Sequence, residues 1–146
     1  MQLNPILNFN GQCEEAFKFY QECLGGTIQT MMTWGESPMA DHVPAEWRDK
    51  IIHTTLVVGD TVLMGGDSPS DRYEKPAGFT VAINLDDTAQ AERIFNQLAE
   101  NGSVTMPLQK TFWAKLVGMA VDRFGIPWMV NCGVAEQSVR TQSQTR

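Results

Sequence analysis

The chain has 146 residues, of which 42% are hydrophobic and 19% are charged, a composition typical of one globular domain or two very small ones. Its 11 Lys and Arg residues and 17 Asp and Glu residues give a net charge of −6, which argues against a nucleic-acid partner because phosphates require clustered cations. No apolar run approaches the ~20 residues that span a bilayer, and no signal segment is evident. Three cysteines make no disulfide framework, so we expect a cytoplasmic protein with reduced thiols and no membrane partner.

The first half of the chain predicts a strand, a helix and three further strands. A helix is expected over 12–24, because apolar residues recur there at intervals of three and four. A long loop is expected over 35–49, where two prolines and mixed charges interrupt the pattern. The strands are predicted at residues 3–9, 27–34, 50–58 and 61–65.

The second half repeats this order after a stretch of turn-forming residues at 66–77. A helix is predicted over 87–100, where Asp87 and Gln90 are compatible with N-terminal capping. The strands are predicted at residues 78–85, 103–109, 114–122 and 126–132. Both halves therefore have the order β-α-β-β-β, and because one copy is too small to bury its sheet face, the two are expected to pack together.

The repeat predicts an α+β fold in a single domain over residues 1–133. Its two modules are expected at 1–67 and 76–133, joined by a linker at 68–75. Residues 134–146 are polar and lack periodicity, and we expect them to form a disordered tail.

Three segments resemble a known family. They read NFNGQCEEAFKFYQECLGG, IIHTTLVVGDTVLMGGD and QKTFWAKLVGMAVDRFGIPWMVNC, and they resemble the PhnB-like branch of the vicinal oxygen chelate superfamily, which includes glyoxalase I, extradiol dioxygenases and bleomycin-resistance proteins. The resemblance covers residues 3–133. It implies two β-α-β-β-β modules that form a curved mixed sheet around a cleft, and a homodimer.

The resemblance also identifies the positions at which metal-binding members carry His, Glu or Gln. These positions are placed here at Pro5, His53, Thr80 and Met129. His53 fits a centre of hard oxygen and imidazole ligands, Thr80 fits poorly, and Pro5 and Met129 do not fit. Since one imidazole cannot hold an ion without partners, we expect neither a metal nor another cofactor.

His53 is the first candidate for contact with a ligand. Alternation along strand 50–58 places it on one face with Ile51 and Thr55. If that face lines the cleft, its imidazole can change charge near neutral pH; the alternative is a hydrogen-bonded structural histidine on a half-buried face.

Other candidates for the cleft are aromatic, thioether and polar side chains. Tryptophan rings offer flat apolar surfaces for stacking, and methionines on strands can line an adaptable pocket, although each of these residues also suits a core. Asp67 follows a strand and suits either the rim of a cleft or a turn cap. The candidates besides His53 are Trp34, Trp113, Trp128, Met129, Thr80 and Asp67, with Met31, Met32, Met64 and Met119 also on predicted strands.

Two functions of different classes remain open at this point. The first is a metal-independent homodimeric module that binds an unknown, partly apolar small molecule. The second is a glyoxalase- or dioxygenase-like enzyme in which His53 acts as acid, base or ligand. A third possibility is a protein-interaction role without a small molecule, so whether the protein is an enzyme stays open.

Overall fold

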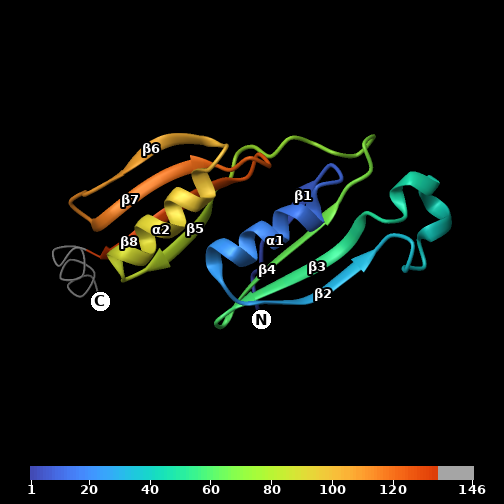
Figure 1. Cartoon of the computed structure of the whole chain (residues 1–146), viewed down its shortest axis with the longest axis horizontal. Coiled ribbons are helices and arrows are strands. Elements are labelled where there is room, and N and C mark those ends of the chain that lie inside the picture. Colours follow the sequence, from blue (N-terminus) through green and yellow to red (C-terminus); the bar gives the residue numbers. More distant parts are fainter. Residues whose placement is uncertain (135–146) are drawn as a thin grey trace. The chain divides into compact units, whose positions relative to one another are not determined.

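In a computed structural model, which describes residues 1–134, the chain divides into two compact units with the boundary between Lys75 and Pro76 (Figure 1). The predicted tail, apart from residue 134, lies outside the described residues. Among the helices of residues 1–134, none has the length and apolar character needed to cross a bilayer.

The first unit is a four-stranded mixed sheet with one long helix. The strands lie in the order β1-β4-β3-β2, with β1 parallel to β4 and the other neighbours antiparallel. Two short 3₁₀ helices occupy the predicted loop between β2 and β3. The elements are β1 Ile6–Phe9, α1 Cys13–Leu24, β2 Thr27–Thr33, η1 Ala40–His42, η2 Ala45–Trp47, β3 Ile51–Val58 and β4 Thr61–Asp67.

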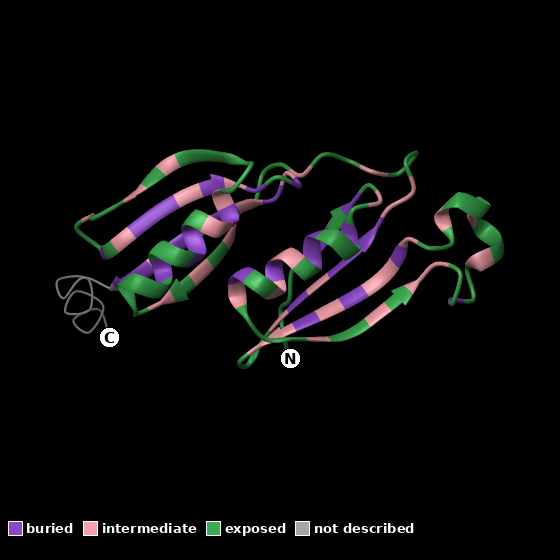
Figure 2. Cartoon of the chain, in the orientation of Figure 1, coloured by how far each residue is buried: buried purple, intermediate pink, exposed green. Residues whose placement is uncertain are grey.

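The apolar stripe of α1 packs on one face of this sheet. Its buried side chains include Phe17 and Tyr20, which are 0% exposed, and Figure 2 shows buried positions along α1 and the strands beneath it. Gly65 in β4 permits a close approach, because a Cβ atom there would clash with the Phe17 ring. The helix face predicted from periodicity is therefore the face that forms the core.

The second unit repeats the architecture with the strand order β5-β8-β7-β6, in which β5 and β8 are parallel. The carboxylate of Asp87 accepts hydrogen bonds from the backbone N–H groups of Ala89 and Gln90 and so caps α2. Gly118 lies under the Phe95 ring, as Gly65 lies under Phe17. The elements are β5 Val81–Leu85, α2 Thr88–Ala99, β6 Ser103–Gln109, β7 Ala114–Val121 and β8 Pro127–Val134.

The α+β fold with two β-α-β-β-β modules is confirmed, with differences at the ends of strands. β1 begins at Ile6 rather than at residue 3, because Pro5 lacks an N–H group for the ladder. β5 begins at Val81 rather than at residue 78, where Gly78 has a φ of 77°. β4 continues to Asp67, beyond the predicted end at residue 65.

Candidate functional site

A row of four side chains crosses the face of the first sheet that α1 leaves uncovered, called here the first open face. Gly65 faces α1, so its neighbour Met64 points to the opposite side. Residues paired across strands share a face and lie ~5 Å apart. The first row consists of Ile6, Met64, Thr55 and Thr30, in strand order β1-β4-β3-β2.

The second sheet carries a corresponding row on the face opposite α2, called here the second open face. Gly118 faces the helix, so Met119 lies on the other side. Met119 is paired with Met129 on one side and with Met106 on the other, and all three are half-buried. The second row consists of Ala82, Met129, Met119 and Met106, in strand order β5-β8-β7-β6.

These rows correct the placement of the family's ligand positions. His53 lies in β3, whereas Met129 lies in β8, and the strand that occupies the place of β8 in the first unit is β4. Because Met64 opposes Ile6 just as Met129 opposes Ala82, Met64 is the counterpart of Met129. The placement of His53 on the strand that matches β8 is therefore wrong. The connection between β2 and β3 is longer than the one between β6 and β7, so equivalent residues after this loop are not separated by the same number of positions as those before it.

The residues at the corrected positions do not fit a glyoxalase-type metal centre. Met64 and Met129 offer thioethers, whereas such an ion prefers oxygen and imidazole ligands. Within residues 1–134, no group of three or more His, Cys, Asp or Glu side chains is placed to hold a metal ion.

His53 lies on the first open face beside the row. It is half-buried, it opposes Met32 on β2, and its Nε2 atom is 3.2 Å from the hydroxyl oxygen of Thr55. The predicted shared face of His53 and Thr55 agrees with this contact, whereas the inclusion of Ile51 is wrong. A bulge after the pair of Met32 and His53 interrupts the alternation, and Ile51 lies in the core at 1% exposure.

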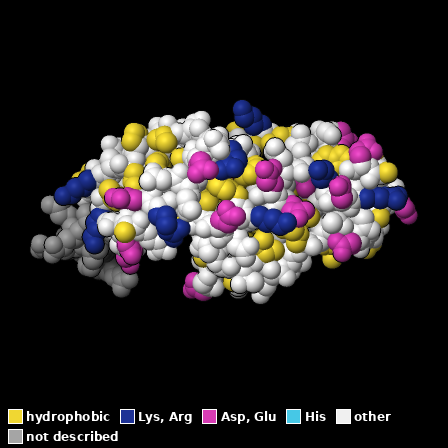
Figure 3. All heavy atoms as spheres, in the orientation of Figure 1, with side chains coloured by type: hydrophobic (Ala, Val, Ile, Leu, Met, Phe, Trp, Pro, Cys, Tyr) yellow, Lys and Arg dark blue, Asp and Glu magenta, His cyan; other side chains and the backbone are white. Residues whose placement is uncertain are grey.

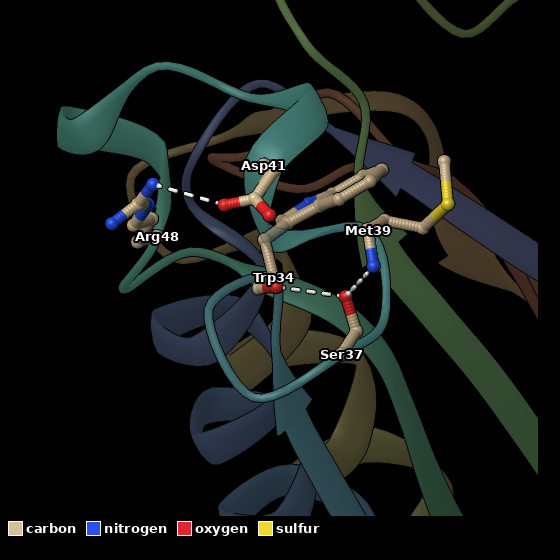
Figure 4. A network of polar contacts seen from close by, with 5 residues as sticks. All are labelled: Trp34, Ser37, Met39, Asp41 and Arg48. Carbon is tan, nitrogen blue, oxygen red and sulfur yellow. Dashed lines mark hydrogen bonds and ion pairs between the residues drawn. The ribbon is translucent and has the colours of Figure 1, made fainter.

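Trp34 anchors the long loop of the first unit (Figure 4). Its indole N–H donates to the carbonyl oxygen of Asp67 at 3.1 Å, and its own carbonyl accepts from the hydroxyl of Ser37 at 2.7 Å. Further along the loop, Arg48 and Asp41 form an exposed ion pair at 3.6 Å. The polar part of the indole is therefore used to hold the loop on the end of β4.

Asp67 is 3% exposed, and its carboxylate accepts three backbone hydrogen bonds. Oδ1 accepts from Gly11 at 2.8 Å and from Cys13 at 3.0 Å, and Oδ2 accepts from Ile51 at 2.9 Å. The three contacts tie the start of α1 and the start of β3 to the end of β4. This arrangement favours the capping alternative over a carboxylate at a cleft rim.

The other two tryptophans differ in exposure. Trp128 is 2% exposed, and its indole N–H donates to Asp122 at 2.9 Å, so it belongs to the core of the second unit. Trp113 is 40% exposed and packs edge-on against Phe112, which is 76% exposed, with ring centroids 4.8 Å apart. Of the two, only Trp113 offers an accessible ring. Thr80 is exposed and precedes β5.

The second open face also carries a polar pair that the sequence did not single out. Asn131 on β8 donates from Nδ2 to Oδ1 of Asn84 on β5 at 3.1 Å. The two amides line a hollow of ≈ 210 Å³ together with Leu85, Asp86 and Gly133. The sequence repeat could have drawn attention to Asn84, because it aligns with Asn8 of the first half. Its partner Asn131 on β8 could be found only from the strand register.

The cysteines of the described part of the chain are free and buried. Burial raises the pKa of the Cys13 thiol well above its ordinary value of 9.0, and the charges of Asp67 and Glu14 add to the effect. Burial likewise raises the pKa of Cys132, against an opposing effect of Lys115. Neither environment activates a thiolate nucleophile.

Charged side chains form no single-sign surface on the visible face of the described residues. Figure 3 shows Lys and Arg side chains interspersed with Asp and Glu over both units. This distribution lacks the clustered cations of a nucleic-acid interface.

Comparisons with known proteins give the same architecture. Residues 2–130 match the Glyoxalase/Bleomycin resistance protein/Dioxygenase superfamily. Protein YjdN from Escherichia coli (strain K12) is 33% identical over 140 residues, which cover 90% of this chain and 95% of YjdN.

Two solved structures extend the comparison. Protein PA1353 from Pseudomonas aeruginosa is 51% identical, with a TM-score of 0.84 over 91% of this chain and 98% of PA1353. The PhnB protein from Bacillus cereus is 21% identical, with a TM-score of 0.76 over 91% of this chain and 100% of that protein, and it shares the fold. The extent of the family match, together with the strand order repeated in both units, establishes that the chain belongs to the Glyoxalase/Bleomycin resistance protein/Dioxygenase superfamily.

Proposed function

We propose that this protein is a cytoplasmic small-molecule-binding member of the PhnB-like branch, that it binds a partly apolar ligand without a metal centre, and that it acts as a homodimer. The observation that carries the proposal is the pair of matched rows on the two open faces, with Met64 and Met129 at equivalent places. Methionine side chains are flexible and polarizable, so they adapt to an apolar ligand. Trp113 adds an exposed aromatic ring.

His53 supplies the polar contact in this proposal. It is half-buried beside the first row, and within residues 1–134 its side chain contacts the hydroxyl of Thr55 through Nε2, so the other ring nitrogen is available to a ligand. A glyoxalase- or dioxygenase-like enzyme that uses His53 is the second candidate. The thioethers at the equivalent positions weigh against it.

Native mass spectrometry of gently purified protein tests the two candidates together. We expect a subunit pair that carries an organic mass increment and no stoichiometric metal. One equivalent of zinc, nickel, manganese or iron retained through dialysis would favour the metalloenzyme instead.

The variant His53→Gln tests the role of the imidazole. We expect a loss of the organic mass increment with a cost to folding of about 1 kcal/mol or less, since His53 is half-buried and makes one hydrogen bond. His42→Gln, the same change at the exposed histidine of η1, is the control for general perturbation. A severe loss of stability with full retention of the ligand would contradict the functional role of His53.

A further inference from the structure

The two amides that join β5 and β8 leave one acceptor and one donor unused. Asn131 and Asn84 are directly opposed in the parallel register, and the hydrogen bond from Asn131 Nδ2 to Asn84 Oδ1 uses one group of each. An amide has one acceptor oxygen and one NH₂ donor group. Within the described residues, the oxygen of Asn131 and the NH₂ group of Asn84 therefore remain without a hydrogen bond.

The unused acceptor is buried. Within residues 1–134, Oδ1 of Asn131 is shielded from solvent and has no hydrogen-bond partner. A buried acceptor without a donor costs about 1–3 kcal/mol, so a turn of the Asn131 side chain that brings this oxygen to an N–H donor bound in the hollow would recover this free energy. Asn84 is exposed, so its NH₂ group is accessible to the same bound group.

The space beside the pair is large enough for more than water. The hollow of ≈ 210 Å³ is well above the ~10–15 Å³ that one water requires. Gly133 forms part of its lining with a φ of 65°, and a Cβ atom there would meet the side chain of Lys115 at 2.9 Å. Glycine at this position avoids that clash and leaves the space unfilled.

The charges around the hollow are of opposite sign. Asp86 lines it, and Lys115 lies against Gly133; the two have opposing effects on the neighbouring thiol of Cys132. Asp87 acts on this thiol in the same direction as Asp86, so carboxylates outnumber the lysine here and the hollow disfavours an anionic group. Met129 and Ala82 lie two residues before Asn131 and Asn84 on the same strands, so the apolar second row shares their face.

We propose that this hollow is the subsite for a carboxamide-type group, in which a donor and an acceptor are adjacent, carried by a ligand whose apolar part lies on the second row. The inference rests on the proposed function and names the chemical class of the ligand. A primary amide, a urea or the lactam edge of a heterocycle meets the requirement, because each gives an N–H to Asn131 and accepts one from Asn84. A carboxylate lacks the donor, and a protonated trialkyl amine lacks the acceptor.

The test uses benzamide and N,N-dimethylbenzamide, which share a ring and a carbonyl but differ in the N–H donor. Binding to the full chain is followed by the chemical shifts of side-chain amides in ¹⁵N-labelled protein. We expect benzamide to shift the Asn131 and Asn84 signals saturably and N,N-dimethylbenzamide to bind at least fivefold more weakly. Asn84→Ala and Asn131→Leu should abolish this preference.

The first unit offers a matched control. Asn8→Ala removes the amide at the position equivalent to Asn84, where Gly66 stands opposite and no second amide is present, and the preference should persist. Equal binding of the two probes, or a preference that survives Asn84→Ala, would overturn the subsite.

A third probe separates this inference from the proposed function. Ethylbenzene has the apolar part alone, and its binding should weaken in Met129→Ala. Binding of ethylbenzene without an amide preference would overturn the carboxamide subsite and leave the apolar surface intact. Failure of all three probes to bind at their solubility limits would contradict both proposals.

Discussion

Two buried aspartates accept hydrogen bonds from backbone N–H groups at turns and at the starts of helices and strands. Asp67 accepts hydrogen bonds from three backbone N–H groups of the first unit. Asp122 accepts from the N–H groups of Phe124 and Ile126 and from the indole of Trp128 in the second. Each carboxylate gives a hydrogen-bond acceptor to N–H groups that folding removes from water. Without it, these donors would be buried unpaired, which would destabilise the fold.

Asp67→Ala should therefore destabilise the protein severely. It leaves the N–H groups of Gly11, Cys13 and Ile51 without an acceptor, and we expect a loss of about 3 kcal/mol or more in the free energy of unfolding. Urea denaturation followed by circular dichroism measures it. Asp41→Ala is the control, because its exposed ion pair with Arg48 contributes ~0–1 kcal/mol. A loss below about 1 kcal/mol for Asp67→Ala would contradict the capping role.

Cys13 gives stability a dependence on alkaline pH. Its pKa is raised in the folded state, so the thiol stays neutral there while the unfolded chain ionises above its ordinary value of 9.0. Its contribution is complete below pH 9 and declines as the pH rises, by up to about 1.4 kcal/mol per pH unit. Stability curves of wild type and Cys13→Ala between pH 8 and 10.5 should converge with rising pH. Parallel curves would show that Cys13 does not titrate differently in the two states.

At the scale of elements, each helix rests on a glycine. Gly65→Ala would drive a Cβ atom into the Phe17 ring, and overpacking of this kind costs about 1–3 kcal/mol. Phe17→Leu removes the outer ring atoms, so the double variant should be more stable than the sum of the two single effects predicts. A double-mutant cycle in urea should give a coupling of at least about 0.5 kcal/mol. Additive effects of the two substitutions would show that a Cβ atom at position 65 does not press on the Phe17 ring.

Strands and helices were predictable because their signals are local. The stripes of α1 and α2 follow a period of three to four residues, and the observed helices start and end within one residue of the predicted bounds. The bulge in β3 was not predictable, since it depends on which residue of β2 opposes Ile51. One extra residue there sends Ile51 to the core while His53 stays on the open face.

The candidate site was less accessible to sequence analysis because its residues meet only through strand register. Five of the methionines were identified as strand residues, but Met106 was not. Its pairing with Met119 depends on a bulge in β6. Asn84 and Asn131 are 47 positions apart, and neither residue type signals a site. Trp128 was a candidate for ligand stacking, and only the structure shows that its ring is buried in the core.

For the whole molecule we predict a homodimer. Small sheets with uncovered faces and free strand edges favour pairing, and exposed apolar residues such as Ile6 at 58% and Met32 at 40% lie on the first open face. Sedimentation at micromolar concentration should give about twice the chain mass of 16.3 kDa. A single species of 16.3 kDa would contradict the dimer.

The second row also has a chemical consequence for the life of the protein in an oxidising solution. Peroxide converts a thioether into a chiral, polar sulfoxide, and Met106, Met119 and Met129 are neighbours across three strands and remain half-buried. A single added oxygen would place a strong dipole in the middle of an otherwise apolar strip. The surface that makes this sheet adaptable to a ligand is thus also one whose polarity an oxidant changes without breaking the backbone. Sulfoxide reductases can restore it.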